Sequence, residues 1–144
     1  MGLWIIQSIK RELSGKYNYQ ELMLLAEKSD YKGILNVNDN SLLAPASMIT
    51  AVKECLKKQG EPEPADLGDL LRAVYEGLAD CYAKAADGIE KLTGRKFDTI
   101  VIVGGGSRDD LLTRLAGERS GRKTVKGETE ATAYGNLLVQ FGIQ

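Results

Sequence analysis

The chain has 144 residues and a formal net charge of −1, and charged residues make up 27% of it. That length suits one ordinary domain with its own core. A near-neutral charge excludes the basic field that would attract nucleic acid or an anionic membrane, and no apolar run approaches the ~18 to 20 residues of a membrane span. Histidine is absent, which excludes Ser-His-Asp and Cys-His catalysis within this chain and most zinc or iron sites. We therefore expect no metal ligands.

Cysteine usage and the N-terminal residues bear on location. Cys55 and Cys81 are too few and too widely spaced for a disulfide framework or a zinc site. Both fall on apolar faces of expected helices, so we predict buried thiols and a reducing, cytoplasmic setting. The stretch MGLWIIQSIKRE lacks a basic n-region and becomes charged soon after Gln7, which does not fit a signal peptide.

The first sixty residues predict three helices. Apolar residues recur at helical spacing over residues 3–13, and Asn18 is the expected N-cap of a second helix over residues 19–28. Residues 30–45 lose this periodicity and include VNDNSLLAP, so we predict an irregular loop. Its Asp-Asn-Ser run favours a solvated turn over a binding site. A third helix then begins near Ser47 and ends at Gly60.

The longest expected helix begins after Asp66 and ends at Gly94. Its apolar residues step by three or four over about seven turns: Leu67, Leu70, Leu71, Val74, Leu78, Cys81, Tyr82, Ala85, Ile89 and Leu92. Gly77 and Gly88 lie inside it, at a cost of up to about 1 kcal/mol each relative to alanine. We expect both glycines to allow close packing against another element.

The last third changes from a helical to a strand-like pattern. FDTIVIV, residues 97–103, is short and β-branched and predicts a strand buried on both faces. Three glycines and a helix follow, then a short strand at KTVKG, residues 123–127, and a last helix over 130–141. We expect that helix to bury Ala131, Tyr134, Leu137, Leu138 and Phe141, with Glu130 as its cap and Gly135 at a close contact. The order predicts a parallel α/β sheet that needs further strands as neighbours.

The glycine turn, VGGGSRDD over residues 103–110, fails three known patterns. A phosphate-binding P-loop needs Gly-Lys followed by Ser or Thr, which is absent here. The dinucleotide fingerprint and the nucleophile elbow both need glycine where this chain has Asp109.

The turn still has physical meaning. Glycines after a strand let another group approach the backbone closely. We expect Ser107 to cap the following helix, with Asp109 and Asp110 in its first turn. These carboxylates would repel a phosphate, with only Arg108 to offset them, so a bound nucleotide would present its base or ribose here. The alternative is a tight strand-to-helix turn that binds nothing.

The segment GGGSRDDLLTRLAGERSGRKTVKGETEATAYGN resembles the adenosine-binding segment of the FGGY carbohydrate kinases, and within them most closely the kinases of L-rhamnulose. GLWIIQ and LAPASM, residues 2–7 and 43–48, are similar to further segments of these kinases, so the resemblance covers nearly the whole chain in order. The chain departs from the family pattern where Arg108 and Asp109 replace a glutamine and an asparagine.

The resemblance implies the fold, an α/β, helix-rich part of a ribonuclease-H-like (actin-like) second domain with few strands. Residues 1–144 would form one C-terminal, nucleotide-binding portion. The catalytic Asp, the sugar site and the first phosphate loop would lie upstream, so the chain would be a truncated product or an expressed fragment. In the intact enzyme ATP with Mg²⁺ would phosphorylate L-rhamnulose to L-rhamnulose 1-phosphate, whereas this chain alone would be inactive.

The resemblance also implies where ATP or ADP binds. The glycines would form a flat wall for adenine, the next three residues would surround base and ribose, and Gln7 would add a polar contact beside Gly2. The expected site is Gly2, Gln7, Gly104, Gly105, Gly106, Ser107, Arg108 and Asp109. For Gln7 the alternative is an exposed helical glutamine. For the chain the alternative is a non-catalytic interaction module that lost the nucleotide.

The expected partners follow from the same resemblance. They are the nucleotide, and the sugar only through the upstream domain, with neither nucleic acid nor membrane. The missing strands would leave apolar surface and an open sheet edge, for which we expect self-association.

Overall fold

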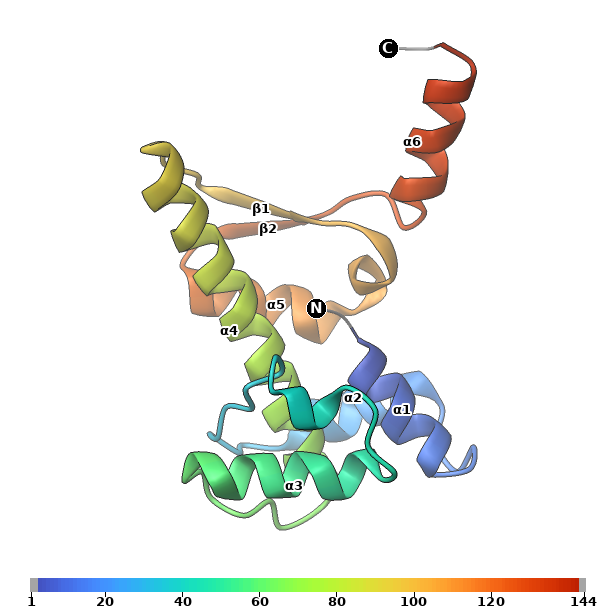
Figure 1. Cartoon of the computed structure of the whole chain (residues 1–144), viewed down its shortest axis with the longest axis vertical. Helices are drawn as coiled ribbons and strands as arrows, with labels where there is room; N and C mark the ends of the chain where they lie inside the picture. The colour runs from blue at the N-terminus through green and yellow to red at the C-terminus, as the bar shows by residue number, and fades with distance from the viewer. Residues whose placement is uncertain (1–2, 143–144) are drawn as a thin grey trace.

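The computed structural model describes residues 3–142, except for the side chains of Ala131, Thr132 and Tyr134. The helices are α1 (Trp4–Glu12), α2 (Tyr19–Lys28), α3 (Met48–Gln59), α4 (Leu67–Thr93), α5 (Asp110–Ser120) and α6 (Ala131–Gln140), and the strands are β1 (Thr99–Ile102) and β2 (Lys123–Lys126). Two short 3₁₀ helices, η1 (Asn40–Leu42) and η2 (Gly104–Arg108), complete the order. Figure 1 shows α1, α2 and α3 around one end of α4, the strands near its other end, and α6 standing apart.

The two strands confirm the predicted parallel α/β arrangement. β1 and β2 pair in parallel, with Thr99 opposite Lys123 and Ile102 opposite Lys126. Helix α5 makes the crossover between them and packs against α4 (Figure 1). The described part of the chain is therefore a helix-rich α/β structure with a two-stranded sheet.

Helices α2, α3 and α4 begin and end where the sequence predicts. Asn18 caps α2 in a reciprocal capping box with Glu21, and the side chains of Ser47 and Asp66 cap α3 and α4. Gly60 ends α3 in the left-handed conformation, at φ 78°. Such caps satisfy backbone groups that the helix cannot satisfy itself.

The core lies between α1, α2, α3, the first half of α4 and α5. Its largest fully buried side chains include Tyr75 and leucines from six segments of the chain. Gly77 confirms the predicted close packing, because a Cβ there would lie 2.1 Å from the Leu35 carbonyl oxygen. For Gly88 the same prediction is wrong: a Cβ there would meet no atom within 4 Å. None of the described helices has the length and apolar character needed to cross a membrane.

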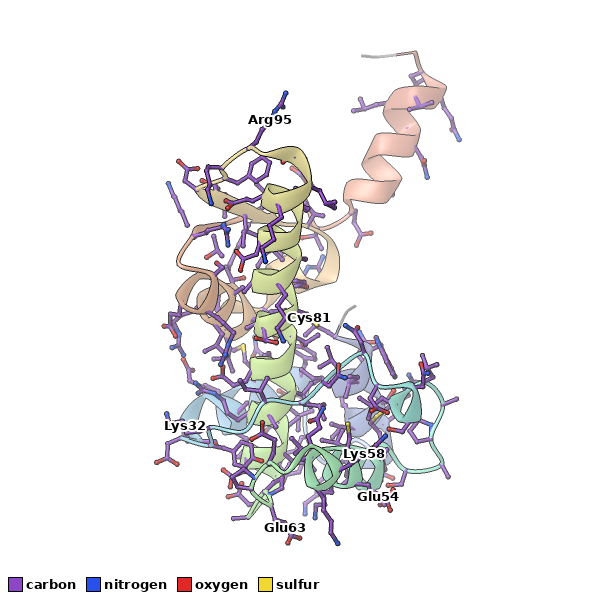
Figure 2. All side chains as sticks on the ribbon, turned by 60° about the vertical axis from the view of Figure 1, so that its left-hand side comes forward. Lys32, Glu54, Lys58, Glu63, Cys81 and Arg95 are labelled. Carbon is purple, nitrogen blue, oxygen red and sulfur yellow. The ribbon has the colours of Figure 1, made fainter. Side chains whose placement is uncertain are left out.

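The two cysteine thiols, one on α3 and one on α4, differ in burial. Cys55 is buried in the core, as predicted. Cys81 is only half-buried, and its Sγ accepts a hydrogen bond from the Asn38 amide at 3.3 Å. Figure 2 shows Cys81 midway along α4, beyond the part of the helix that α3 covers. The prediction of a fully buried thiol is therefore wrong for Cys81.

Strand β1 is not buried on both faces, which corrects the expectation for residues 97–103. Val101 is 57% exposed and Val103 is 53% exposed, and within β1 only Ile102 is buried. The reason is geometric: among the described residues β1 pairs with β2 alone, so one edge of the strand and one face of the sheet stay uncovered. Ile89 and Leu92 at the end of α4 are exposed too.

Helix α6 corrects a second expectation of burial. Its Leu137 and the following Phe141 are exposed, because α6 projects away from the rest of the fold (Figure 1). Glu130 stands at the N-cap position without a side-chain capping bond, and a Cβ on Gly135 would meet no atom within 4 Å. The expected capping bond and the expected close contact are therefore wrong, and the predicted burial of Ala131 and Tyr134 concerns side chains that are not described.

A buried ion cluster joins α4 to α5. The Glu76 carboxylate is 10% exposed and pairs with Arg72 of its own helix, at 2.8 Å, and with Arg119 of α5. Burial alone would raise the pKa of Glu76, but hydrogen bonds from Arg119 and Arg72 outweigh burial and hold the pKa below its ordinary value of 4.5. The charged form of Glu76 is therefore the one that stabilises the fold.

We expect this cluster to make the free energy of unfolding depend on pH. Because the pKa of Glu76 is lowered on folding, its contribution is fully present above pH 4.5 and is lost as the pH falls through the folded-state pKa. Glu76→Gln should lower the free energy of unfolding at pH 7 by about 2 kcal/mol. In urea titrations it should also reduce the loss of unfolding free energy that the wild type shows as the pH falls below 4.5.

Glu54→Gln is the matched control for Glu76→Gln. Glu54 is an exposed carboxylate on α3, at the end of the molecule away from the sheet (Figure 2). The Glu54→Gln variant should keep the wild-type pH dependence of the free energy of unfolding. If Glu76→Gln also keeps it, the Glu76 carboxylate does not cause this pH dependence.

Candidate functional site

The glycine turn links β1 to α5 through a single turn of 3₁₀ helix. Gly104 has φ 74°, a conformation that favours glycine. Its N–H donates to the Glu128 carbonyl at 3.0 Å, which ties the turn to the segment after β2. The chain then runs through η2 and enters α5 at Asp110.

The cap of α5 differs from the sequence-based prediction. Ser107 does not cap the helix, because η2 delays the start of α5 and the Ser107 hydroxyl donates to the Gly104 carbonyl at 2.8 Å instead. Asp109 is the N-cap residue, and its Oδ1 accepts the Leu112 N–H at 2.9 Å. Ser107 is 4% exposed, so its side chain stabilises the turn from within.

The Asp109 carboxylate points into the protein. Its Oδ2 accepts hydrogen bonds from the Tyr75 hydroxyl at 2.6 Å and the Tyr19 hydroxyl at 2.9 Å, and the residue is 1% exposed. Asp110 is exposed and pairs with Lys126 of β2. One of the two carboxylates is therefore enclosed and the other is paired, and their expected repulsion of a phosphate beside the turn stays a prediction.

A groove of about 470 Å³ opens beside the turn. It is lined by Leu3, Gln7, Tyr19, Tyr82, Val103, Gly105, Gly106 and Arg108. Gln7 on α1 and the glycine turn are about a hundred residues apart in sequence, and the fold brings them to one hollow, as the resemblance implied. Pockets of a few hundred Å³ with mixed apolar and polar walls are typical of small-molecule sites.

Of the eight predicted residues, four line this groove, three described ones do not, and one is not described. Gln7, Gly105, Gly106 and Arg108 contribute to its wall. Gly104, Ser107 and Asp109 lie behind that wall and shape the turn. Gly2 lies outside the described residues. The ligand contacts themselves remain predictions for all eight.

The two inner glycines face different surroundings. A Cβ on Gly105 would meet no atom within 4 Å, so this position faces open space beside the groove. A Cβ on Gly106 would lie 3.5 Å from the Ile102 side chain and 3.8 Å from the Tyr82 hydroxyl, which are ordinary contacts. The wall at these residues is bare backbone, which a flat ligand could approach closely.

Sequence reasoning missed the aromatic part of the wall. Tyr19 was expected only as the first residue of a helix, and Tyr82 only as part of the apolar stripe of α4. Hydrophobic periodicity in the sequence predicts which face of a helix turns inward, but it does not show which inward residues border a groove. The position of Tyr19 directly after the N-cap Asn18 gave no signal of this role.

A second hollow of about 450 Å³ lies between the C-terminal half of α4 and β1. Its lining is apolar except for a few groups such as Arg122, which pairs with Asp87 and Glu90. The Phe97 N–H, Lys96 and Arg122 lower the pKa of Glu90 to about 2, so these polar groups satisfy one another. Among the described residues no cluster of three or more Cys, Asp or Glu side chains could hold a metal ion.

Comparison with known proteins now identifies the class. The profile of the FGGY family of carbohydrate kinases, C-terminal domain, matches residues 1–142. The chain therefore belongs to the FGGY family of carbohydrate kinases.

Three similar curated proteins are named rhamnulokinase. Those of Halalkalibacterium halodurans and Bacillus subtilis are 34% and 35% identical to this chain, and that of Enterococcus faecalis is 38% identical. Each alignment covers 98% of this chain but only 29% to 30% of the relative. The chain thus spans about 30% of the length of the rhamnulokinases that it matches.

The Asp109 contacts predict a specific loss of stability. Asp109→Ala should lower the free energy of unfolding by about 3 kcal/mol, because it removes the cap of α5 and leaves the buried Tyr75 and half-buried Tyr19 hydroxyls without their acceptor. Asp109→Asn should cost about 1 kcal/mol, since its amide oxygen still accepts from Leu112. Urea denaturation measures both values.

Asp110→Ala is the control for these variants. Asp110 neighbours Asp109, but it is exposed and forms only a surface ion pair with Lys126. Its loss should change the free energy of unfolding by about 0.5 kcal/mol or less. Equal losses for Asp109→Ala and Asp110→Ala would contradict the role assigned to the buried carboxylate.

Proposed function

We propose that this chain is the nucleotide-binding portion of a rhamnulokinase-like enzyme and that the groove beside the glycine turn binds the adenosine end of ATP or ADP. The observation that carries the proposal is the meeting of Gln7, Gly105, Gly106 and Arg108 in one hollow. The family match and the rhamnulokinase relatives support it. On this proposal the fold is part of a ribonuclease-H-like, actin-like domain.

The lining of the groove supports binding of the adenosine end of the nucleotide in it. Leu3, Tyr19, Tyr82 and Val103 give apolar and aromatic surface, which suits a flat base better than a hydrated phosphate. Arg108 is exposed, and among the described residues no carboxylate lies within 4 Å of its guanidinium. Its charge is therefore available to the anionic part of the nucleotide outside the groove.

The chemistry follows from this orientation. In the proposed reaction the γ-phosphoryl group of ATP passes to a hydroxyl of L-rhamnulose, and ADP and L-rhamnulose 1-phosphate are the products. Phosphoryl transfer depends on positioning and on neutralising charge, which Mg²⁺ supplies when bound to the phosphates. This chain would hold the nucleotide, whereas the sugar site, the catalytic base and the metal contacts would belong to residues outside it.

The bare wall at Gly105 predicts that a side chain added there weakens nucleotide binding. Gly105→Val places a branched side chain in open space beside the wall, so it should weaken ADP binding at least tenfold with no change in melting temperature. Calorimetric titration with ADP measures the affinity. Gly88→Val is the matched control, because Gly88 also faces open space but lies on α4 outside the groove lining.

The same preparation separates the proposal from its alternatives. Mixed with Mg-ATP and L-rhamnulose, the chain should bind nucleotide and form no sugar phosphate in a coupled assay. Robust turnover would overturn the assignment of the catalytic groups to residues outside this chain. A folded protein that is silent towards ADP would favour the non-catalytic interaction module.

The uncovered face of β1 supports self-association of the isolated chain, with a second copy as the partner. Val101 and Val103 are more than half exposed there, beside the apolar hollow along α4, and exposed apolar strands associate edge to edge. Sedimentation velocity should show association that increases with concentration. Val101→Lys should shift the protein towards monomer, whereas Leu24→Lys, which replaces an exposed leucine on α2, should not. A strictly monomeric wild type would contradict this partner.

A further inference from the structure

Two tyrosines from separate helices border the groove together with the glycine turn. Tyr19 is the first residue of α2, and Tyr82 lies in the middle of α4. Both line the groove with Gly105 and Gly106. The fold therefore places two phenol rings beside a bare backbone wall.

The Tyr19 hydroxyl is already engaged. It donates to the Asp109 Oδ2 at 2.9 Å, and the Tyr75 hydroxyl donates to the same oxygen at 2.6 Å. Burial and the Asp109 charge raise the pKa of Tyr19, so its hydroxyl stays a protonated donor at neutral pH. The donor of Tyr19 is therefore used by Asp109, and this bond holds the ring beside the groove in a fixed orientation.

The Tyr82 hydroxyl has a different environment. It lies near Gly106, at 3.8 Å from where a Cβ of that residue would be. Within the described residues this hydroxyl forms no hydrogen bond. Every fully enclosed side-chain polar atom there has a partner, so the Tyr82 hydroxyl is not fully enclosed. Burial, and then the Asp109 charge, raise the pKa of Tyr82. This hydroxyl is therefore a neutral donor and acceptor at the groove wall.

We propose that Tyr19 and Tyr82 determine which nucleobase the groove accepts. The Tyr19 ring, positioned by Asp109, packs against the base, and the Tyr82 hydroxyl forms a hydrogen bond with the nucleoside. This inference rests on the proposed function and deepens it. Ring packing favours the larger purine over a pyrimidine, and a hydroxyl left unpaired in the groove disfavours a base that cannot reach it.

The experiment compares ADP, UDP and inorganic pyrophosphate by calorimetric titration of the whole chain. Wild-type protein should bind ADP more tightly than UDP. Tyr19→Leu should weaken ADP binding about tenfold and reduce the preference for ADP over UDP, since only the ring surface is lost to the base. Tyr82→Phe should weaken ADP binding about fivefold, the scale of one hydrogen bond. Pyrophosphate affinity should not change in either variant.

Two controls separate base recognition from loss of structure. Tyr17→Phe removes a hydroxyl from a tyrosine outside the groove lining and should leave all three affinities unchanged. Tyr82→Phe should keep the wild-type melting temperature, and Tyr19→Phe, which keeps the ring, should retain most of the ADP preference. If Tyr19→Leu unfolds, Tyr82→Phe and Tyr19→Phe still test the proposal.

The outcomes distinguish the two proposals. If wild-type protein binds ADP and the Tyr19 and Tyr82 variants keep both its affinity and its preference over UDP, the tyrosine inference is overturned and the proposed function stands. If folded wild-type protein binds neither ADP nor UDP, the proposed function fails and this inference with it. A parallel loss of ADP, UDP and pyrophosphate binding would show a structural role and overturn base selection.

Discussion

The candidate site depends on the buried carboxylate of Asp109. Its two oxygens accept hydrogen bonds from the start of α5, from Tyr19 on α2 and from Tyr75 on α4. An enclosed carboxylate is costly unless such donors surround it, so these elements must meet at one point for the fold to be stable. That requirement fixes the direction in which the glycine turn enters α5, and it fixes the ring of Tyr19 beside the turn. The same contacts thus position the backbone and the aromatic wall of the groove.

The two ends of α4 differ in how far the surrounding elements cover their apolar side chains. Around the first half of α4 the helices cover one another and enclose a continuous core. Around β1 the sheet has two strands, and valines that a fuller sheet would enclose are open to solvent. The match to a C-terminal domain, over about 30% of the length of the relatives, accords with this contrast. The groove lies where the helical core meets the sheet, because Tyr19 comes from α2 and Val103 directly follows β1.

Helix boundaries and the strand order were predictable because local chemistry determines them. Asn18, Ser47 and Asp66 are capping residues followed by apolar residues at helical spacing, and Gly60 permits the left-handed end of a helix. Burial of β1 and α6 was not predictable, since an apolar strand or helix is buried only where another element covers it. Half of the candidate groove was reached from the sequence through the family resemblance, and its tyrosines were missed because helical periodicity does not reveal a hollow.

By itself, the sequence determined the helices, the two parallel strands and the family, since caps, periodicity and motif residues are local properties of the chain. The glycine turn was also recognisable, but its chemistry was not. Only the tertiary structure decided that Asp109 faces inward and that Ser107 braces the turn instead of capping α5. It also brought Gln7 and Gly105 to one groove, which the resemblance had implied and local patterns had not. The physical reason is that a side chain adjacent to a turn can face ligand or core, and the choice depends on hydrogen-bond partners such as Tyr19 and Tyr75, which come from distant parts of the chain.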